Sequence, residues 1–258
     1  MQQYALITGA SKGIGKAIAT ELASRGFNVI LVARSADALQ TAVKEITSRY
    51  NVKADALALD LSTPDAAQQV LDWCLGKNYE VCALVNNAGY GLSGSFEKYT
   101  VAEHLNMMQL NMGSLVGLTR LFLPELRKRT RAYILNIASS AAYQAVPKLS
   151  TYAASKAFVL AFSRGLHQEL HGSSVSITAV SPGATDTDFP NRAQLGEKGL
   201  KAAAKLNMSP EAVASLSVKA MLAGRSEIIT GFVNKLGAAM AWLLPKSFVE
   251  RTAMKIYE

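Results

Sequence analysis

Three residues that could move a proton at a carbonyl group lie close together in this sequence: Ser139, Tyr152 and Lys156. Tyr152 and Lys156 are four positions apart in Tyr-Ala-Ala-Ser-Lys, so a helix would present both side chains on one face. A phenol ionises near pH ~10, and an ammonium group held beside it favours the phenolate. The pair therefore predicts a tyrosine that acts as a general acid–base.

Ser139 follows the apolar run 132–138, which is typical of a buried parallel strand. A residue at the end of such a strand lies at the carboxyl edge of the sheet, where open α/β folds bind ligands. On spacing alone, Tyr152 and Lys156 are explained at least as well as an exposed pair on a helix, and Ser139 as a turn residue, as they are by a catalytic role. The choice between a catalytic site and these ordinary structural roles therefore depends on the strands and helices around the three residues.

Length and composition favour one domain that covers residues 1–258. Half of the residues are hydrophobic, and there is no linker, repeat or low-complexity tract. Met1–Tyr4 runs directly into a strand pattern, so we expect no signal peptide and a cytoplasmic protein. Cys74 and Cys82 lack metal or redox spacing, which predicts two buried, reduced thiols.

The net charge of +8 raises the question of polyanionic partners. The only dense basic cluster, 127–131, surrounds a helix-to-strand turn and lacks stacking aromatic residues of its own. We therefore expect no nucleic-acid partner. An attraction for phosphorylated cofactors fits the charge equally well.

The first strand pattern, Tyr4–Thr8, leads into the glycine turn Gly9–Gly15 and then into a helical pattern. Glycines permit a sharp turn and a close approach of phosphate, and a helix N-terminus offers free N–H groups to a pyrophosphate. The spacing Gly-x-x-x-Gly-x-Gly is not the usual dinucleotide fingerprint, and a plain turn remains open. The candidate cofactor residues here are Gly9, Ser11, Lys12, Gly13, Ile14 and Gly15.

The second strand pattern, Phe27–Ala33, ends at Arg34 instead of the acidic residue expected for a ribose 2′-hydroxyl. A cation suits a 2′-phosphate, and Lys12 could supply a second one. Both residues predict NADP(H) in preference to NAD(H). The alternative is that Arg34 is a solvated residue at the start of a helix.

Further strand patterns alternate with helical ones, which predicts an α/β, Rossmann-like, doubly wound parallel sheet with helices on both faces. The longest helical pattern, Val101–Lys128, carries Asn111 on an apolar face, where a buried amide needs a partner. A structural role, in which the Asn111 amide makes hydrogen bonds in the core, and a catalytic role explain this residue equally well. Residues 188–207 are a candidate substrate lid.

Taken together, these motifs resemble the short-chain dehydrogenase/reductase family over almost the whole chain. Thr8–Gly15 is similar to its cofactor turn and Asn86–Gly89 to its structural turn. The catalytic tetrad of the family resembles Asn111, Ser139, Tyr152 and Lys156.

The resemblance implies that Tyr152 protonates a carbonyl oxygen as hydride arrives from the nicotinamide, while Ser139 hydrogen-bonds that oxygen. It implies that Lys156 holds the nicotinamide ribose and that Asn111 positions water in a proton relay. It also implies that further residues contact the cofactor: Asp60, Leu61, Asn87, Ala88, Gly89, Tyr152, Lys156, Pro182, Gly183, Thr185 and Thr187.

The segment 232–258 departs from the common family ending and predicts two short helices separated at Pro245. Apolar residues mark one face of each helix and should be buried on the pocket or on a partner subunit: Phe232, Leu236, Met240 and Leu243 in the first, and Phe248, Val249, Ala253 and Ile256 in the second. Contact with an anionic membrane is the alternative. We expect a homodimer or homotetramer.

The family resemblance predicts a small carbonyl or alcohol substrate, and an apolar pocket would make it lipophilic. The suggested pocket wall comprises Tyr90, Leu92, Tyr143, Val146, Leu149 and Phe189. His167 and His171 could share a metal, but no third ligand has suitable spacing, so we predict no metal site. A non-catalytic NADP(H) sensor or scaffold and a membrane-peripheral lipid-handling protein are the alternative functions.

Overall fold

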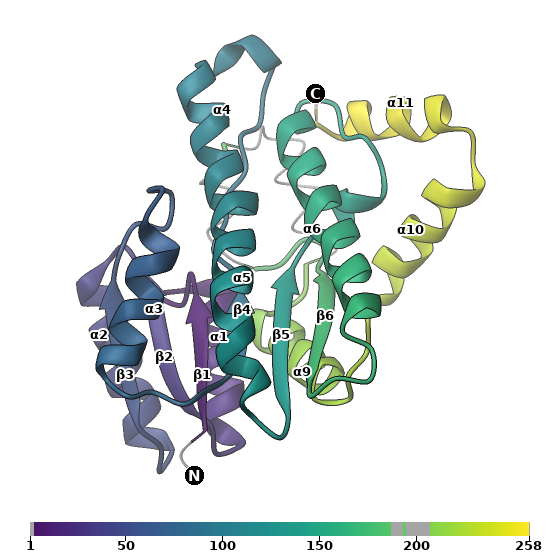
Figure 1. Cartoon of the computed structure of the whole chain (residues 1–258). Coiled ribbons are helices and arrows are strands. Elements are labelled where there is room, and N and C mark those ends of the chain that lie inside the picture. The colour runs from purple at the N-terminus through teal and green to yellow at the C-terminus, as the bar shows by residue number, and fades with distance from the viewer. Residues whose placement is uncertain (1–2, 187–192, 195–206, 258) are drawn as a thin grey trace.

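The computed structural model describes residues 3–186, 193–194 and 207–257. Seven parallel strands form one sheet in the order β3-β2-β1-β4-β5-β6-β7 (Figure 1). The strands are β1 (Tyr4–Thr8), β2 (Asn28–Ala33), β3 (Ala54–Ala58), β4 (Val81–Asn86), β5 (Ala132–Ile137), β6 (Val175–Ser181) and β7 (Glu227–Ile229). The direction of winding reverses between β1 and β4, and this point is where such sheets bind ligands.

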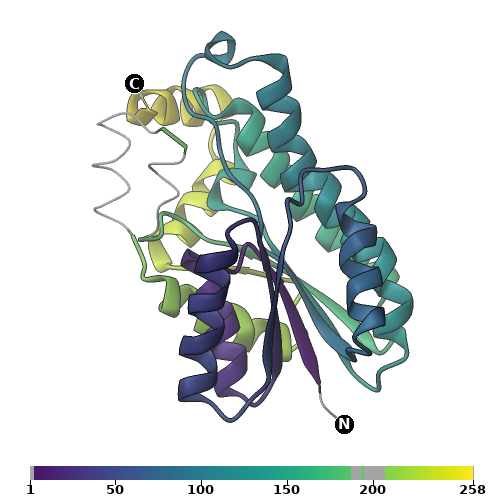
Figure 2. The same cartoon turned by 90° about the vertical axis from the view of Figure 1, so that its left-hand side faces the viewer.

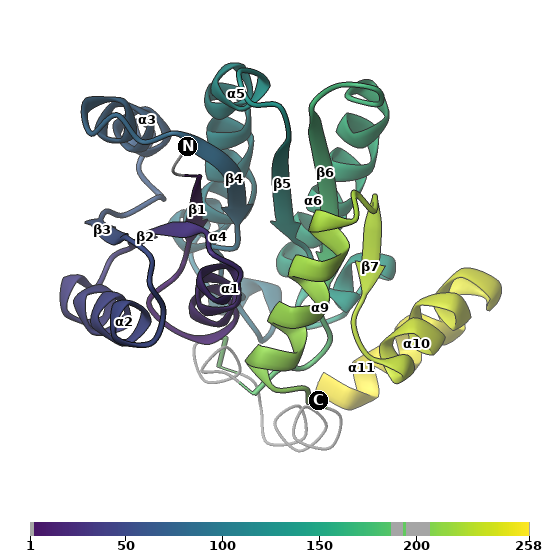
Figure 3. The ribbon, with the colours of Figure 1, turned by 90° about the horizontal axis from the view of Figure 1, so that it is seen from below.

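Helices cover both faces of the sheet, which confirms the predicted doubly wound α/β fold (Figures 2 and 3). One face carries α1 (Gly13–Ser24), α2 (Ala36–Arg49) and α9 (Pro210–Leu222), and the other carries α3 (Ala66–Gly76), α5 (Ser114–Arg127) and α6 (Ser150–Glu169). The central strands are buried on both faces, so they have continuous apolar runs instead of an alternating pattern.

The predicted helix 101–128 is interrupted where Asn111 lies. It consists of α4 (Val101–Met108), a π-helical turn (Gln109–Gly113) and α5. Thr100 and Glu103 start α4 with a reciprocal capping box. A π-helical turn inserts one residue into the helix and re-aims the side chains that follow, and such turns are frequent at functional sites.

Buried polar side chains link β4 and β5 to the helices above them. Asn86 Nδ2 donates to Asn136 Oδ1 at 2.9 Å and to Thr119 Oγ1 at 3.1 Å. Asn136 Nδ2 donates in turn to Ser163 Oγ on α6 at 2.9 Å. Because buried polar groups require partners, this network fixes α5 and α6 relative to the strand ends.

The C-terminal segment forms α10 (Phe232–Leu243) and α11 (Lys246–Tyr257), which meet at Pro245 as predicted. They lie at the edge of the molecule, beyond β7 and α6 (Figure 1). The large apolar residues on the predicted face of α10 do not pack on the protein's own cavity, because Phe232, Leu236 and Leu243 are 80, 54 and 69% exposed. Their burial on a partner subunit stays a prediction. The buried face of α10 carries small residues instead, and Ala241 is 2% exposed.

Phe248 on α11 is also exposed, whereas Ala253 is buried as expected. Within the described part of the chain, no helix combines the length and hydropathy that a membrane span requires. Cys74 and Cys82 are buried free thiols, as predicted. The proposed lid 188–207 falls mostly outside the described residues, as do Thr187 and Phe189.

Candidate active site

A cavity of about 720 Å³ lies at the carboxyl edge of the sheet and unites most of the predicted site. Its wall contains Ser139, Tyr152 and Lys156. The predicted cofactor residues that also line it are Gly9, Ser11, Lys12, Gly13, Ile14, Gly15, Arg34, Asp60, Leu61, Asn87, Ala88, Gly89, Pro182, Gly183 and Thr185. Asn111 is buried and is not part of the wall.

The glycine turn has a shape that larger residues cannot adopt. Gly9 and Gly13 have φ angles of +64° and +58°, a region that favours glycine. A Cβ atom on Gly15 would lie 2.3 Å from the Gly9 carbonyl oxygen and 2.4 Å from Asn87 Nδ2. The turn is therefore held close to β4, and α1 begins directly at the cavity with its free N–H groups.

Hydrogen bonds of the Thr8 and Asn87 side chains connect the ends of β1 and β4. Thr8 Oγ1 accepts hydrogen bonds from the backbone N–H groups of Asn87 (2.9 Å) and Ala88 (3.0 Å). Asn87 Nδ2 donates to the carbonyl oxygens of Thr8 (2.8 Å) and Gly9 (3.2 Å). These bonds tie the ends of the two neighbouring strands together at the cavity.

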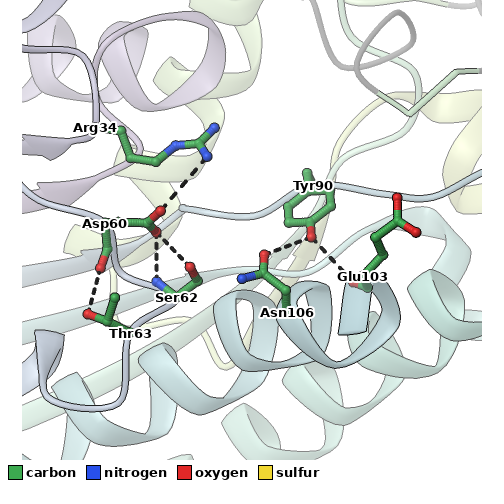
Figure 4. Close-up of polar contacts among 7 residues, drawn as sticks. All are labelled: Arg34, Asp60, Ser62, Thr63, Tyr90, Glu103 and Asn106. Atoms are coloured by element: carbon green, nitrogen blue, oxygen red, sulfur yellow. Dashed lines mark hydrogen bonds and ion pairs between the residues drawn. The ribbon is translucent and has the colours of Figure 1, made fainter. Parts of the chain in front are cut away.

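Arg34 and Asp60 both line the cavity, and their side chains lie next to each other (Figure 4). Arg34 Nη1 lies 3.9 Å from Asp60 Oδ2, and both side chains are well exposed. Asp60 Oδ1 accepts hydrogen bonds from Ser62 N at 2.9 Å and Ser62 Oγ at 2.8 Å. The Asp60 carboxylate is thus held by its own turn, and the Arg34 guanidinium lies beside it.

Lys156 lies beside Tyr152, with its Nζ atom 5.9 Å from the centre of the phenol ring. Its ammonium group donates to the Ile137 carbonyl oxygen at 2.8 Å, at the end of β5. Burial lowers the pKa of Lys156 to about 8. The group still carries its proton at neutral pH, and its charge is little screened by water.

Ser139 extends from the end of β5, as predicted, and caps the short 3₁₀ helix Ser140–Tyr143. Its Oγ atom accepts a hydrogen bond from Ala141 N at 3.1 Å. Because one lone pair is used in this way, the position of the hydroxyl group is fixed and its proton can point elsewhere. Ser139 can therefore donate to an oxygen atom in the cavity.

The Asn111 amide is fully engaged inside the protein. Its Nδ2 atom donates to the Tyr90 carbonyl oxygen and to Ser155 Oγ, both at 3.0 Å, and Oδ1 accepts from Tyr90 N at 3.1 Å. A Cβ atom on Gly89 would lie 2.9 Å from Asn111 Oδ1. The side chain thus positions the segment next to Tyr152 and Lys156, and Tyr90 is further anchored by Asn106 (Figure 4).

The suggested apolar wall is correct in part. Tyr143, Val146 and Leu149 line the cavity, whereas Leu92 lines a smaller one near His104. Tyr90 is not part of either wall. The Nδ1 atom of His167 lies 2.7 Å from the Ile177 carbonyl oxygen, a contact that packs α6 against β6.

Sequence reasoning missed two contributors to the site. The Tyr143 hydroxyl group donates to the Glu227 carboxylate and accepts from Ser181 Oγ at 3.0 Å, and these contacts hold the segment after Ser139 against β6 and β7. Asn234 of α10 packs on the Pro182–Gly183 turn, where a Cβ on Gly183 would lie 2.2 Å from its amide. An asparagine within the apolar pattern of α10 was the available signal.

A family model described as short chain dehydrogenase matches residues 3–198. The very-long-chain 3-oxoacyl-CoA reductase-B of Danio rerio is 36% identical over 184 residues, which cover 70% of this chain and 58% of that enzyme. The chain therefore spans less than two thirds of the length of this relative.

Two solved structures have the same fold. A short-chain dehydrogenase from Sphingobium yanoikuyae in complex with NADPH has a TM-score of 0.81 at 28% identity and covers 94% of each chain. A short-chain dehydrogenase/reductase from Burkholderia phymatum in complex with NAD has a TM-score of 0.83 at 24% identity and covers 92% of each chain. The match over residues 3–198, with the glycine turn and the Ser139–Tyr152–Lys156 cluster in one cavity, shows that the chain belongs to the short-chain dehydrogenase/reductase family.

Proposed function

We propose that this protein is an oxidoreductase that interconverts a carbonyl group and an alcohol, with Tyr152 as the general acid–base. The observation that carries the proposal is that Ser139, Tyr152 and Lys156 line the same cavity as the glycine turn. The turn fits a dinucleotide, since Gly9 and Gly13 adopt positive φ angles and α1 begins at the cavity, where its free N–H groups can bind a pyrophosphate. A bound nicotinamide cofactor would supply or accept the hydride.

The residues of this chain would orient the carbonyl group and manage its proton. Ser139 donates a hydrogen bond to the carbonyl oxygen, because Ala141 N already occupies one of its lone pairs. Tyr152 transfers its phenolic proton to that oxygen during reduction. The Lys156 ammonium stabilises the phenolate that remains, and Asn111 acts as a positioning residue through Tyr90 and Ser155.

The test is Tyr152→Phe, which removes the proton and leaves the ring. We expect turnover of carbonyl substrates to fall by about 10²–10⁴-fold, the usual contribution of a general acid. NADPH binding, measured by fluorescence titration, should persist. Tyr50→Phe is the matched control, because Tyr50 lies at the C-terminal end of α2 and does not line the cavity.

Near-native turnover by Tyr152→Phe would refute the assigned chemistry. A wild-type protein that binds NADPH but reduces no carbonyl compound in a broad panel would favour the alternative function, a cofactor sensor or scaffold.

We further propose that NADP(H) is preferred to NAD(H). Arg34 and Lys12 line the cavity, and Ala33 stands at the end of β2 where an acidic residue would repel a 2′-phosphate. Replacing Ala33 with Asp and Arg34 with Gln should lower the NADPH-to-NADH ratio of kcat/KM at least about tenfold, since a charged hydrogen bond contributes about 1.5–3 kcal/mol. Arg49→Gln, at the far end of α2, is the control.

The substrate we propose is lipophilic, because Val146, Leu149 and Ala241 contribute apolar wall to the cavity. A 3-oxoacyl thioester series of increasing chain length would test this assignment by steady-state kinetics. If kcat/KM does not rise with chain length, the lipophilic assignment fails. A homodimer or homotetramer and a cytoplasmic location stay predictions, and sedimentation velocity would measure the assembly.

A further inference from the structure

Exposed apolar residues are concentrated on the two C-terminal helices. Within the part of the chain that the structure describes, eight of the fourteen exposed large apolar side chains belong to α10 and α11. They are Phe232, Val233, Leu236, Met240, Trp242, Leu243, Phe248 and Met254. Scattered single residues of this kind need no explanation, but a concentration on one element marks an interaction surface.

The arrangement on α10 is the reverse of an ordinary surface helix. Its large apolar residues recur at positions 232, 236, 240 and 243 and form the outer face, where exposure runs from 44 to 80%. The inner face carries Asn234, Ala238 and Ala241, which line the cavity. The small residues on the inner face of α10 pack against the rest of the protein. The large apolar residues on its outer face take no part in that packing.

Cations accompany this apolar face. Lys235, Lys246 and Arg251 are exposed on the two helices, and the acidic residue in the same segment, Glu250, is half-buried. Trp242, at 80% exposure, lies near the helix junction. Large apolar side chains, an exposed tryptophan and exposed cations are the features by which helices bind the interface of an anionic bilayer.

The apolar face is continuous with the mouth of the cavity. Val233 is 52% exposed, yet it also lines the cavity, and Gly237 on the next turn does the same. Nothing lies within 4 Å of a Cβ placed on Gly237, so the wall is open at that point. A surface that covered α10 would therefore lie directly at the entrance to the site.

We propose that the outer face of α10 and α11 docks on an anionic lipid bilayer, with the cavity entrance directed toward the membrane. A second copy of this chain is the less favourable occupant, because a two-fold contact would bring like-charged Lys235, Lys246 and Arg251 clusters together. An anionic headgroup layer pairs with those cations, while its acyl boundary accepts the apolar side chains.

The experiment is cosedimentation of the full chain with vesicles of phosphatidylcholine alone and of an equimolar mixture of phosphatidylcholine and phosphatidylglycerol. We expect binding to the mixed vesicles and much weaker binding to the neutral ones. Phe232→Ser combined with Trp242→Ser should lower the partition onto mixed vesicles by about a hundredfold. Lys235→Gln combined with Arg251→Gln should lower it by about thirtyfold.

The matched control is Val101→Ser combined with Leu105→Ser, which removes exposed apolar residues from α4 and should leave the partition unchanged. Thermal unfolding of each variant verifies that it is folded. The assay contains no substrate, so its outcome is independent of the oxidoreductase activity proposed above.

Three outcomes would overturn the proposal. The first is that the intact chain binds neither vesicle. The second is that the α4 control loses as much binding as the tail variants. The third is that sedimentation velocity finds an oligomer that dissociates in the Phe232→Ser/Trp242→Ser variant, in which case a second copy covers this face.

Discussion

Lys156 should destabilise the fold, although the proposed chemistry depends on it. Burial lowers its pKa from 10.5 to about 8, so folding disfavours its charged form. A difference of 2.5 pKa units corresponds to about 3 kcal/mol of unfolding free energy at pH 7. Lys156→Met removes that penalty together with the hydrogen bond from Nζ to the Ile137 carbonyl oxygen, which contributes about 1 kcal/mol.

We therefore expect Lys156→Met to be more stable than the wild type by about 2 kcal/mol at pH 7, with carbonyl reduction largely lost. The sign of the pH dependence follows from proton binding. Between pH 8 and 10.5 the unfolded state holds a proton on Lys156 that the folded state has released, so wild-type stability rises through this window. The advantage of the methionine variant should shrink to about zero near pH 10.

Urea unfolding of both proteins without cofactor, at pH 7 and at pH 10, measures this difference and cancels the titration of other groups. Lys156→Gln keeps the polar contact without the charge and is the control for packing. The reasoning is refuted if Lys156→Met is less stable than the wild type at pH 7. It is equally refuted if the difference between the two proteins does not change with pH.

Two further substitutions test the glycine turn and its support. Thr8→Val should lower the unfolding free energy by about 2–3 kcal/mol, because it leaves the N–H groups of Asn87 and Ala88 without their acceptor. The control Thr8→Ser keeps a hydroxyl group and should lower it by less than about 1 kcal/mol. Urea unfolding midpoints compare the two variants. Gly15→Ala should weaken NADPH binding at least about tenfold, because the added Cβ would displace the Gly9 carbonyl oxygen. Gly165→Ala is the control and should leave binding unchanged, because nothing lies within 4 Å of its added Cβ. A fluorescence titration measures both.

The fold was predictable because local signals agreed with one another. Continuous apolar runs such as Val81–Val85 identify strands that are buried on both faces, and the glycine turn and Ser209–Pro210 mark helix starts. The π-helical turn at Asn111 was not predictable. The turn carries the Asn111 amide that bonds Tyr90 and Ser155, and these residues are 21 and 44 positions away, so the contacts leave no local pattern.

In the candidate site, too, the local motifs were predictable and the contacts between residues far apart in the sequence were not. The turn Asn86–Gly89 and the pair Tyr152–Lys156 are local motifs, so their spacing was informative. Glu227 lies 84 positions from Tyr143, and only the sheet order brings β7 to that segment. The sequence pattern did not show which face of α10 meets the cavity, because hydrophobicity was taken as the sign of burial, whereas small residues near Gly237 line the cavity wall.

The strand order has a consequence for the newly made chain. β1 pairs with β2 on one side and with β4 on the other, although β4 is the fourth strand to leave the ribosome. While residues 59–86 are still being translated, β1, β2 and β3 can assemble, which leaves the hydrogen-bonding edge along Tyr4–Thr8 open on a strand that is buried in the finished fold. The period in which nascent chains can associate through that edge is therefore set by the rate of elongation, and slow codons in this interval would lengthen it.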